Sequence, residues 1–234
     1  MEQFWRMNLE VETRSAFHTL GPGRSLPLVD RALQVDAEGY PMLSGSTVKG
    51  RVRSHLERLL KALKRPVCRP PRPDQMCPHF QPVDDRLASL KEPYCLACRI
   101  FGSAWRESAV TFGGFFLTEE LKREGALPVE RTSVGISRRL GSAQAERLFF
   151  SQTTAPASTL RFVGQIEGRM TQEEIGWLLI AFNLVTHLGG DKARGLGRVR
   201  LRVTGLSCWN PETRTWEEVE PRTLVKEVVN RATL

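Results

Sequence analysis

The residues best suited to chemistry lie in a glycine-rich, basic segment at positions 188–200. Four glycines there let the backbone turn tightly and come close to a ligand, while Lys192, Arg194 and Arg198 supply positive charge. Exposed backbone amides beside cations suit phosphate groups. An ordinary helix-to-strand turn with solvated charges has the same composition, and the Gly-Lys-Ser/Thr ending of a Walker loop is missing.

A second segment, at positions 44–51, places glycine and hydroxyl residues at the start of a predicted helix whose first turn contains Lys49. Free amides at a helix N-terminus, reinforced by the helix dipole, attract phosphate. A plain N-cap at Ser44 or Ser46 would explain the same residues. Two such segments in one chain favour a shared anionic ligand.

The cysteines indicate a metal site. Cys68, Cys77, Cys95 and Cys98 have the spacing C-x8-C-x17-C-x2-C, and the closing pair suits tetrahedral zinc. His79 could replace Cys77, and either set is a closed structural site with no open position for catalysis. Four unrelated reduced thiols are the alternative interpretation. However, a proline-rich insertion with no helix or strand of its own needs a cross-link, such as a bound metal ion, to stabilise it.

Two further titratable residues lie near the N-terminus. His18 follows the first predicted strand, where a histidine is more often structural than functional. Asp30 lies between apolar residues in a loop, where a carboxylate beside a sugar-phosphate backbone could orient a 2'-hydroxyl or a metal-bound water. Composition alone does not distinguish Asp30 from Asp36.

The overall composition favours a polyanionic partner. The 234 residues are 41% hydrophobic, enough for one substantial core, and 34 Lys plus Arg against 26 Asp plus Glu give a net charge of +8. No stretch approaches the roughly 20 apolar residues of a membrane span, and the N-terminus lacks the order of a secretion signal. We therefore expect a cytoplasmic protein of one domain with insertions.

The periodicity of apolar residues predicts an α+β fold. Alternation or β-type composition predicts strands at 9–13, 109–118, 159–167 and 197–204. Spacings of three and four predict helices at 46–63 and from a capping box at Thr171 and Glu174 to Gly189-Gly190. The order strand, helix, strand, strand, helix, strand is that of a ferredoxin-like, RRM-like sheet.

Two regions depart from this order. Prolines exclude regular structure from the first half of 65–106, which we interpret as an insertion. Positions 131–158 combine glycines, small polar residues and arginines, among them Arg138 and Arg139, and predict a long, functional excursion from the core. The pair Gly113-Gly114 predicts a bulge or a close backbone approach.

The motifs at 41–53, 98–102 and 189–199 together resemble the RAMP superfamily of CRISPR-Cas proteins in order and spacing. The chain is most similar to the repeated backbone subunit of type III effector complexes, whose copies line a guide RNA and cleave a complementary target RNA at regular intervals. Ser44 stands where the family commonly has proline, and 20–23 replace its usual Gly-Gly after the histidine.

The resemblance implies a division of the chain and a set of sites. A palm would comprise 1–64, 107–130 and 159–234, with a cysteine-rich, zinc-binding insertion at 65–106 and a thumb hairpin at 131–158 that enters the guide–target duplex. Asp30 would be catalytic, acting with Mg²⁺. The partners would be guide crRNA, target RNA and other subunits of the complex. The expected RNA contacts are His18, Gly45, Ser46, Lys49, Arg53, Arg138, Arg139, Gly189, Gly190, Lys192 and Arg194.

Three hypotheses about function follow from the sequence. In the first, a backbone subunit holds guide RNA and cuts target RNA at Asp30. In the second, a scaffold of the same fold binds RNA without cutting it. In the third, the chain is a zinc-stabilised protein-interaction module with incidental basic charge, and its affinity for RNA should be poor.

Overall fold

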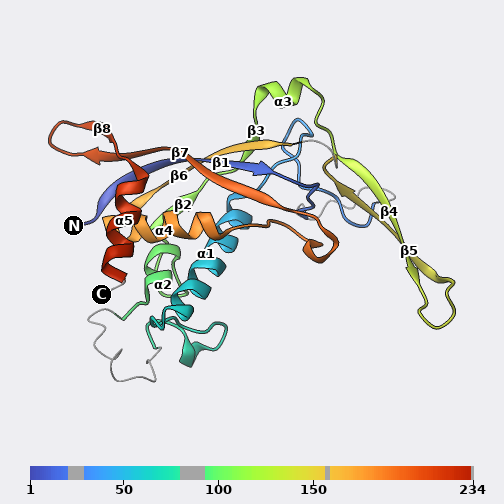
Figure 1. Cartoon of the computed structure of the whole chain (residues 1–234), viewed down its shortest axis with the longest axis horizontal. Coiled ribbons are helices and arrows are strands. Elements are labelled where there is room, and N and C mark those ends of the chain that lie inside the picture. Colours follow the sequence, from blue (N-terminus) through green and yellow to red (C-terminus); the bar gives the residue numbers. More distant parts are fainter. Residues whose placement is uncertain (21–28, 80–92, 156–158, 233–234) are drawn as a thin grey trace.

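A computed structural model describes residues 1–20, 29–79, 93–155 and 159–232 of the chain. Its main feature is an antiparallel sheet with the strand order β2-β6-β1-β7-β8, in which β3 also pairs with β6. The long helices lie on one face of this sheet, and a separate β4–β5 hairpin projects from one end (Figure 1). The fold is thus a mixed α/β arrangement with antiparallel sheets.

Strand β1 (Gln3–Thr13) is central and pairs antiparallel with both β6 and β7. Its buried residues alternate along the chain from Trp5 to Val11, which confirms the predicted period of two. A shift of register with β7 occurs between Asn8 and Leu9. The remaining strands of this sheet are β2 (Val110–Phe112), β3 (Phe116–Leu117), β6 (Arg161–Met170), β7 (Val199–Asn210) and β8 (Thr215–Glu218).

The paired glycines between β2 and β3 mark a close backbone approach, as predicted. A Cβ at Gly45 would overlap the carbonyl oxygens of Phe112 and Gly113, so the first residue of helix α1 (Gly45–Ala62) packs directly on the strand backbone. The amide of Gly113 in turn donates to the carbonyl of Gln165.

Helix α1 (Gly45–Ala62) and helix α4 (Gln172–Leu184) cover the sheet with apolar stripes, as predicted. The predicted capping box is present, because the Thr171 side chain accepts from the Glu174 amide and Glu174 accepts from the Thr171 amide. Within the described residues no helix combines the length and apolar character of a membrane span.

The predicted end of α4 at Gly189-Gly190 was wrong, since the helix stops at Leu184. The segment that follows is extended and pairs with the start of β7: the Leu188 amide donates to Gly197, and the Val199 amide to Thr186. Backbone pairing across the glycine-rich segment thus replaces the last helical turn, which periodicity within the helix does not reveal.

Strand β8 and helix α5 (Pro221–Ala232) were not predicted. Helix α5 buries Leu224 and Val228 against α4, where Gly176 leaves room for the Val228 side chain. A charged helix with so narrow an apolar stripe obtains most of its stability from packing against its tertiary partner. Its sequence alone therefore gives little indication of a helix.

The expectation that the cysteine-rich insertion has no helix was also wrong. Helix α2 (Leu96–Phe101) lies within it, and a 3-10 turn spans Pro73–Gln75. Helix α2 buries Cys98, Ile100 and Phe101 in the core cluster. Part of the predicted insertion, residues 80–92, lies outside the described residues.

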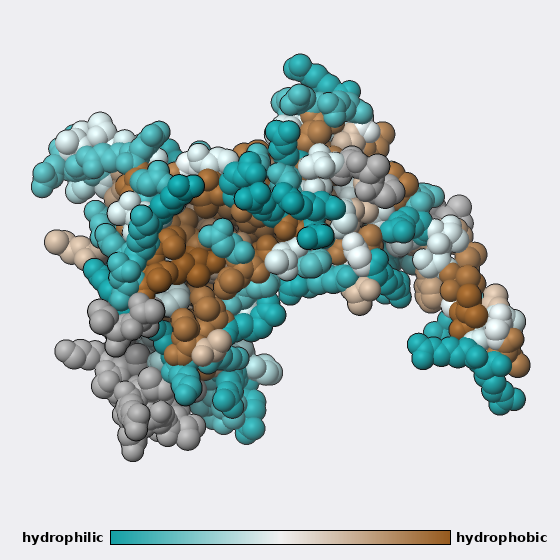
Figure 2. All heavy atoms as spheres, viewed as in Figure 1, coloured by the Kyte–Doolittle hydropathy of each residue, from teal (hydrophilic) through white to brown (hydrophobic). Residues whose placement is uncertain are grey.

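The predicted excursion is a hairpin of β4 (Val129–Ile136) and β5 (Ala143–Thr153), preceded by the short helix α3 (Glu119–Arg123). It begins two residues earlier than expected, and 156–158 lie outside the described residues. Figure 2 shows apolar groups along this projecting hairpin. Its exposed apolar residues include Val134, Ile136, Leu140, Leu148 and Phe149.

The sheet face opposite the long helices carries charged side chains that pair with one another. Arg6 contacts Glu167 at 2.6 Å, and Arg202 lies 3.7 Å from Glu10 and 3.8 Å from Glu12. Because these cations are matched by carboxylates, this part of the open face carries little net charge with which to attract a polyanion.

The contact between α4 and α5 predicts opposite effects for two glycine-to-alanine changes. A Cβ at Gly176 would collide with Val228, so Gly176→Ala should lower the free energy of unfolding by about 1–3 kcal/mol. A Cβ at Gly50 on α1 would meet no atom within 4 Å, so Gly50→Ala should raise it by about 1 kcal/mol. Urea denaturation measures both, and an equally stable Gly176→Ala protein would contradict this packing.

Candidate functional site

The glycine-rich segment forms a tight loop between α4 and β7. Gly189 has φ +79°, and a Cβ there would overlap the carbonyl oxygen of His18. Gly197 has φ +76°, and a Cβ there would overlap the carbonyl oxygen of Leu188. Only glycine fits at these two positions, because each combines a left-handed backbone with a close approach of another chain segment.

His18 is buried against this loop at 3% exposure. The Gly190 amide donates to the His18 carbonyl at 2.9 Å, and the His18 Nδ1 lies 2.7 Å from the Gln152 carbonyl oxygen. Since that oxygen can only accept, Nδ1 carries a proton. The opposite ring nitrogen, Nε2, is buried and has no hydrogen-bond partner among the described residues. It is a polar atom left for a ligand to satisfy.

The start of α1 is capped by Ser44, whose hydroxyl accepts from the Thr47 amide at 3.3 Å. The N-cap interpretation therefore holds for Ser44. Ser46 is exposed, and its hydroxyl lies 3.0 Å from that of Ser44. Ser46 thus remains accessible beside the N-terminus of the helix.

Lys49 and Arg53 follow on α1, one turn apart, and both contact the segment after α2. The Lys49 Nζ donates to the Ser108 hydroxyl at 2.8 Å, and burial, followed by the charge of Arg53, lowers its pKa. Arg53 donates to Gly102 at 2.9 Å and to the sulfur of Cys98 at 3.6 Å. The two Arg53 contacts attach the insertion to α1, and Glu57 on the same helix holds the Arg53 guanidinium in an ion pair.

Arg51 joins α1 to the glycine-rich loop. Its Nε donates to the carbonyl oxygen of His187 at 2.9 Å, two residues before Gly189. The two segments that the sequence selected as phosphate-binding candidates are therefore neighbours in space, with His18 against the same loop.

The cations of the loop are partly balanced. Arg194 lies 3.6 Å from Asp191 with 73% of its side chain exposed, and Arg31 reaches the same carboxylate at 3.8 Å. Lys192 has no ion pair within the described residues. Arg194, Arg31 and Lys192 together outnumber the single carboxylate of Asp191, so the loop retains net positive charge for an anionic ligand.

Asp30 lies at the base of the β4–β5 hairpin. Its carboxylate accepts from the Phe150 amide at 2.8 Å, and its own amide donates to the Phe150 carbonyl at 2.9 Å. Asp36 instead accepts from the amides of Glu38 and Tyr40 within a turn. The structure thus separates two aspartates that composition did not.

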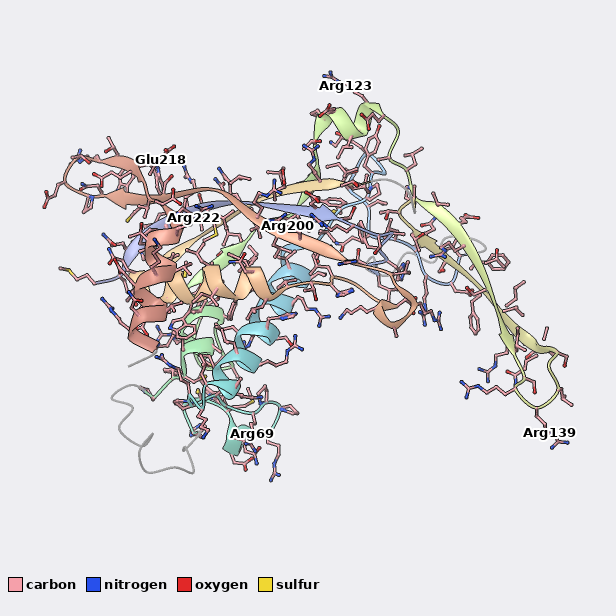
Figure 3. The ribbon with its side chains drawn as sticks, in the orientation of Figure 1. Arg69, Arg123, Arg139, Arg200, Glu218 and Arg222 are labelled. Atoms are coloured by element: carbon pink, nitrogen blue, oxygen red, sulfur yellow. The ribbon has the colours of Figure 1, made fainter. Side chains whose placement is uncertain are left out.

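Arg138 and Arg139 lie at the opposite end of the hairpin. Both side chains are exposed, and Figure 3 shows Arg139 at the tip, far from the sheet. They are not brought together with the other candidate RNA contacts.

The four predicted cysteines meet in a buried cluster whose sulfur atoms all lie within 4.8 Å of one another. The Cys68–Cys98 and Cys68–Cys95 sulfur distances are 3.4 and 3.9 Å. Zinc–sulfur bonds of about 2.3 Å give tetrahedral edges of about 3.8 Å, so the cluster could hold a metal ion such as zinc. His79 packs its ring against Trp105 and is not one of the four.

The pKa values of the clustered thiols shift in opposite directions. Hydrogen bonding with the thiols of Cys68 and Cys98 lowers the pKa of Cys95 to about 2, whereas burial raises that of Cys77 to about 12. A bound metal ion would replace the thiol protons and stabilise all four sulfurs as thiolates.

These features describe a mixed α/β protein with a glycine-rich, basic loop and a four-cysteine cluster. The RAMP superfamily model matches residues 10–200, and the chain belongs to that superfamily. Membership implies a CRISPR-associated role in RNA binding, and the superfamily includes some endoribonucleases. A search of curated proteins found no match.

Sequence reasoning missed Gln152. Its carbonyl holds the His18 ring, and its side chain accepts from the Leu33 amide at 3.3 Å. A single glutamine in an exposed strand carries no signal in the sequence, because its role depends on which segments meet there.

The cysteine cluster predicts that purified protein contains about one tightly bound zinc ion per chain. Cys77→Ser should abolish stoichiometric zinc, while Cys208→Ser, which alters a buried free cysteine outside the cluster, should retain it. Zinc should be released as pH falls, because protons compete for the thiolates. Elemental analysis and thiol counts before and after chelation measure this, and a stably folded, metal-free protein would contradict it.

Proposed function

We propose that this chain is a guide-RNA-binding backbone subunit of a type III CRISPR-Cas effector complex. In this proposal the main sheet and its helices are an RRM-like palm, and the β4–β5 hairpin is the thumb. The strand order β2-β6-β1-β7 supports the proposed palm, because it places the first and third strands of a β-α-β-β-α-β unit side by side.

The observation that carries the proposal is the junction of His18, the glycine-rich loop and α1. Arg51 and the Gly190 amide link the three segments. Exposed Arg194 and half-buried Lys192 add charge at the same place. A sugar-phosphate backbone offers phosphates to these cations and 2'-hydroxyls to the unpaired His18 Nε2, which lacks a proton when the ring is neutral. Sequence would be read by base pairing rather than by the protein.

We further propose that Asp30 takes part in cleavage of the target RNA with Mg²⁺ as cofactor. Asp30 is exposed and lies where the hairpin leaves the sheet. A thumb that bends the target there would bring the scissile phosphate and its neighbouring 2'-hydroxyl into line beside this carboxylate. Such geometry requires assembled subunits and a paired target, so the isolated chain should be inactive.

One observation favours a second candidate, a scaffold that binds guide RNA without cutting. The Asp30 carboxylate already accepts the Phe150 amide and thereby fixes the hairpin base. This contact gives the residue a structural role that needs no chemistry. The third hypothesis, a protein-interaction module, is not favoured by membership of the RAMP superfamily.

Salt dependence tests RNA binding. The logarithm of affinity for single-stranded RNA should fall linearly with the logarithm of salt concentration, with a slope of roughly −0.7 per neutralised phosphate. Lys192→Ala and Arg194→Ala should each reduce the magnitude of the slope by about 0.7. Arg222→Ala on α5, remote from the loop (Figure 3), is the matched control and should leave it unchanged. A flat salt response would refute RNA binding through the backbone.

Two aspartate-to-asparagine variants in an assembled complex separate the cutting subunit from the scaffold. Asp30→Asn keeps an acceptor for the Phe150 amide but removes the charge, so it should slow target cleavage at its position by roughly 100-fold or more and leave guide binding intact. Asp36→Asn, which likewise keeps its turn acceptors, should cleave normally. Normal cleavage by Asp30→Asn would leave the scaffold as the function.

A further inference from the structure

A pocket of about 450 Å³ lies between α1, the segment after α2 and the cysteine-rich insertion. Its volume falls within the range of about 300–1,000 Å³ that is typical of small-molecule sites. No candidate residue except Arg53 belongs to it. Among the residues that line it are Arg53, Met76, Phe101, Arg106, Glu107 and Ser108.

The pocket adjoins the basic surface of α1. Ser108 in its wall receives the hydrogen bond from Lys49, and Arg53 forms another part of the wall. The same helix is joined to the glycine-rich loop through Arg51. Arg51 is two residues from both Lys49 and Arg53, about 200° away around the helix, so an RNA strand would cross the start of α1 to reach this pocket from the glycine-rich loop.

The walls of the pocket are held in place without a ligand. The Ser103 amide donates to Arg106 at 2.8 Å, and the Ser108 hydroxyl donates to Val110 at 2.7 Å. Two apolar wall residues lie close in sequence to cysteines of the cluster. Pro70 is two residues after Cys68, and Met76 directly precedes Cys77. A preformed site spares a ligand the entropic cost of ordering it.

The lining combines apolar surfaces with charged and polar groups. Pro70, Met76 and Phe101 offer apolar contact. Arg106 lies over the Tyr94 ring at 5.3 Å, and neither it nor Glu107 has an ion pair within the described part of the chain. A flat, apolar ring can stack on the apolar wall, and hydrogen-bond donors and acceptors on its edge can pair with Arg106 and Glu107.

We propose that this pocket binds one unstacked nucleobase of the RNA strand, stacked against its apolar wall with its edge toward Arg106 and Glu107. The inference rests on the proposed RNA-binding function and adds a contact to the base, whereas the glycine-rich loop serves the phosphates. In this proposal the cysteine cluster positions the pocket wall that contains Met76, because Met76 directly precedes Cys77.

The first test uses ¹³C-methyl-methionine NMR of the full chain with AMP, GMP, CMP and UMP in turn. Ring currents of a stacked base should shift the Met76 methyl signal saturably for at least one nucleotide, while buried Met7 and Met170 serve as internal controls. Ribose 5-phosphate, which has no base, should not shift it. An unmoved Met76 signal, or an equal shift with ribose 5-phosphate, would overturn the assignment.

The second test fills the pocket. Ala104→Trp places a large ring at the exposed wall residue Ala104 and should abolish the Met76 shift. It should weaken RNA binding roughly tenfold, the contribution of one stacked base, without changing the salt slope. Ala62→Trp, at an exposed position near the end of α1, is the matched control and should change neither. Normal RNA affinity of Ala104→Trp with an intact salt slope would refute the pocket alone, whereas a flat salt response of the unmodified protein would refute RNA binding.

Discussion

The arrangement of the site depends on the burial of one histidine between a glycine-rich loop and the base of a hairpin. His18 can lie there only because Gly189 has no Cβ to collide with its carbonyl. Its ring is then held by the Gln152 carbonyl, and Gly190 donates to its backbone. Segments from the beginning, the middle and the end of the sequence meet at this residue. Any larger residue at 189 would separate them, whatever charges the loop carried.

The elements that follow from local rules were predictable. The apolar stripe of α1, the capping box of α4 and the alternation of apolar residues in β1 each depend on residues that are close together in the sequence. The end of α4, the strand β8 and the helix α5 were not, because backbone pairing beyond Leu184 and burial against Gly176 decide them. Local propensity is a weak guide wherever a tertiary partner supplies most of the stability.

The residues of the candidate site also differ in how far the sequence alone could identify them. Residue types and spacing selected the glycines and the four cysteines, since backbone freedom and thiolate chemistry require particular residues. The family resemblance also selected Arg53, but the structure surrounds that side chain with Glu57, Gly102 and Cys98. The sequence gives the charge of a side chain and not its neighbours, so it could not separate a cation that attaches the insertion from one that is free for a ligand.

The base of β5 is hydrogen-bonded on one side to Asp30 and on the other, through Gln152, to His18. A change in the angle of the hairpin therefore strains both contacts, and a ligand that immobilises the His18 loop restricts the hairpin in return. Thermodynamic linkage makes this coupling reciprocal. Binding of one RNA strand at the His18 loop would then change the affinity of the β4–β5 hairpin for a second strand, and the reverse. The coupling would need only the hydrogen bonds of Asp30 and Gln152 at the base of the hairpin.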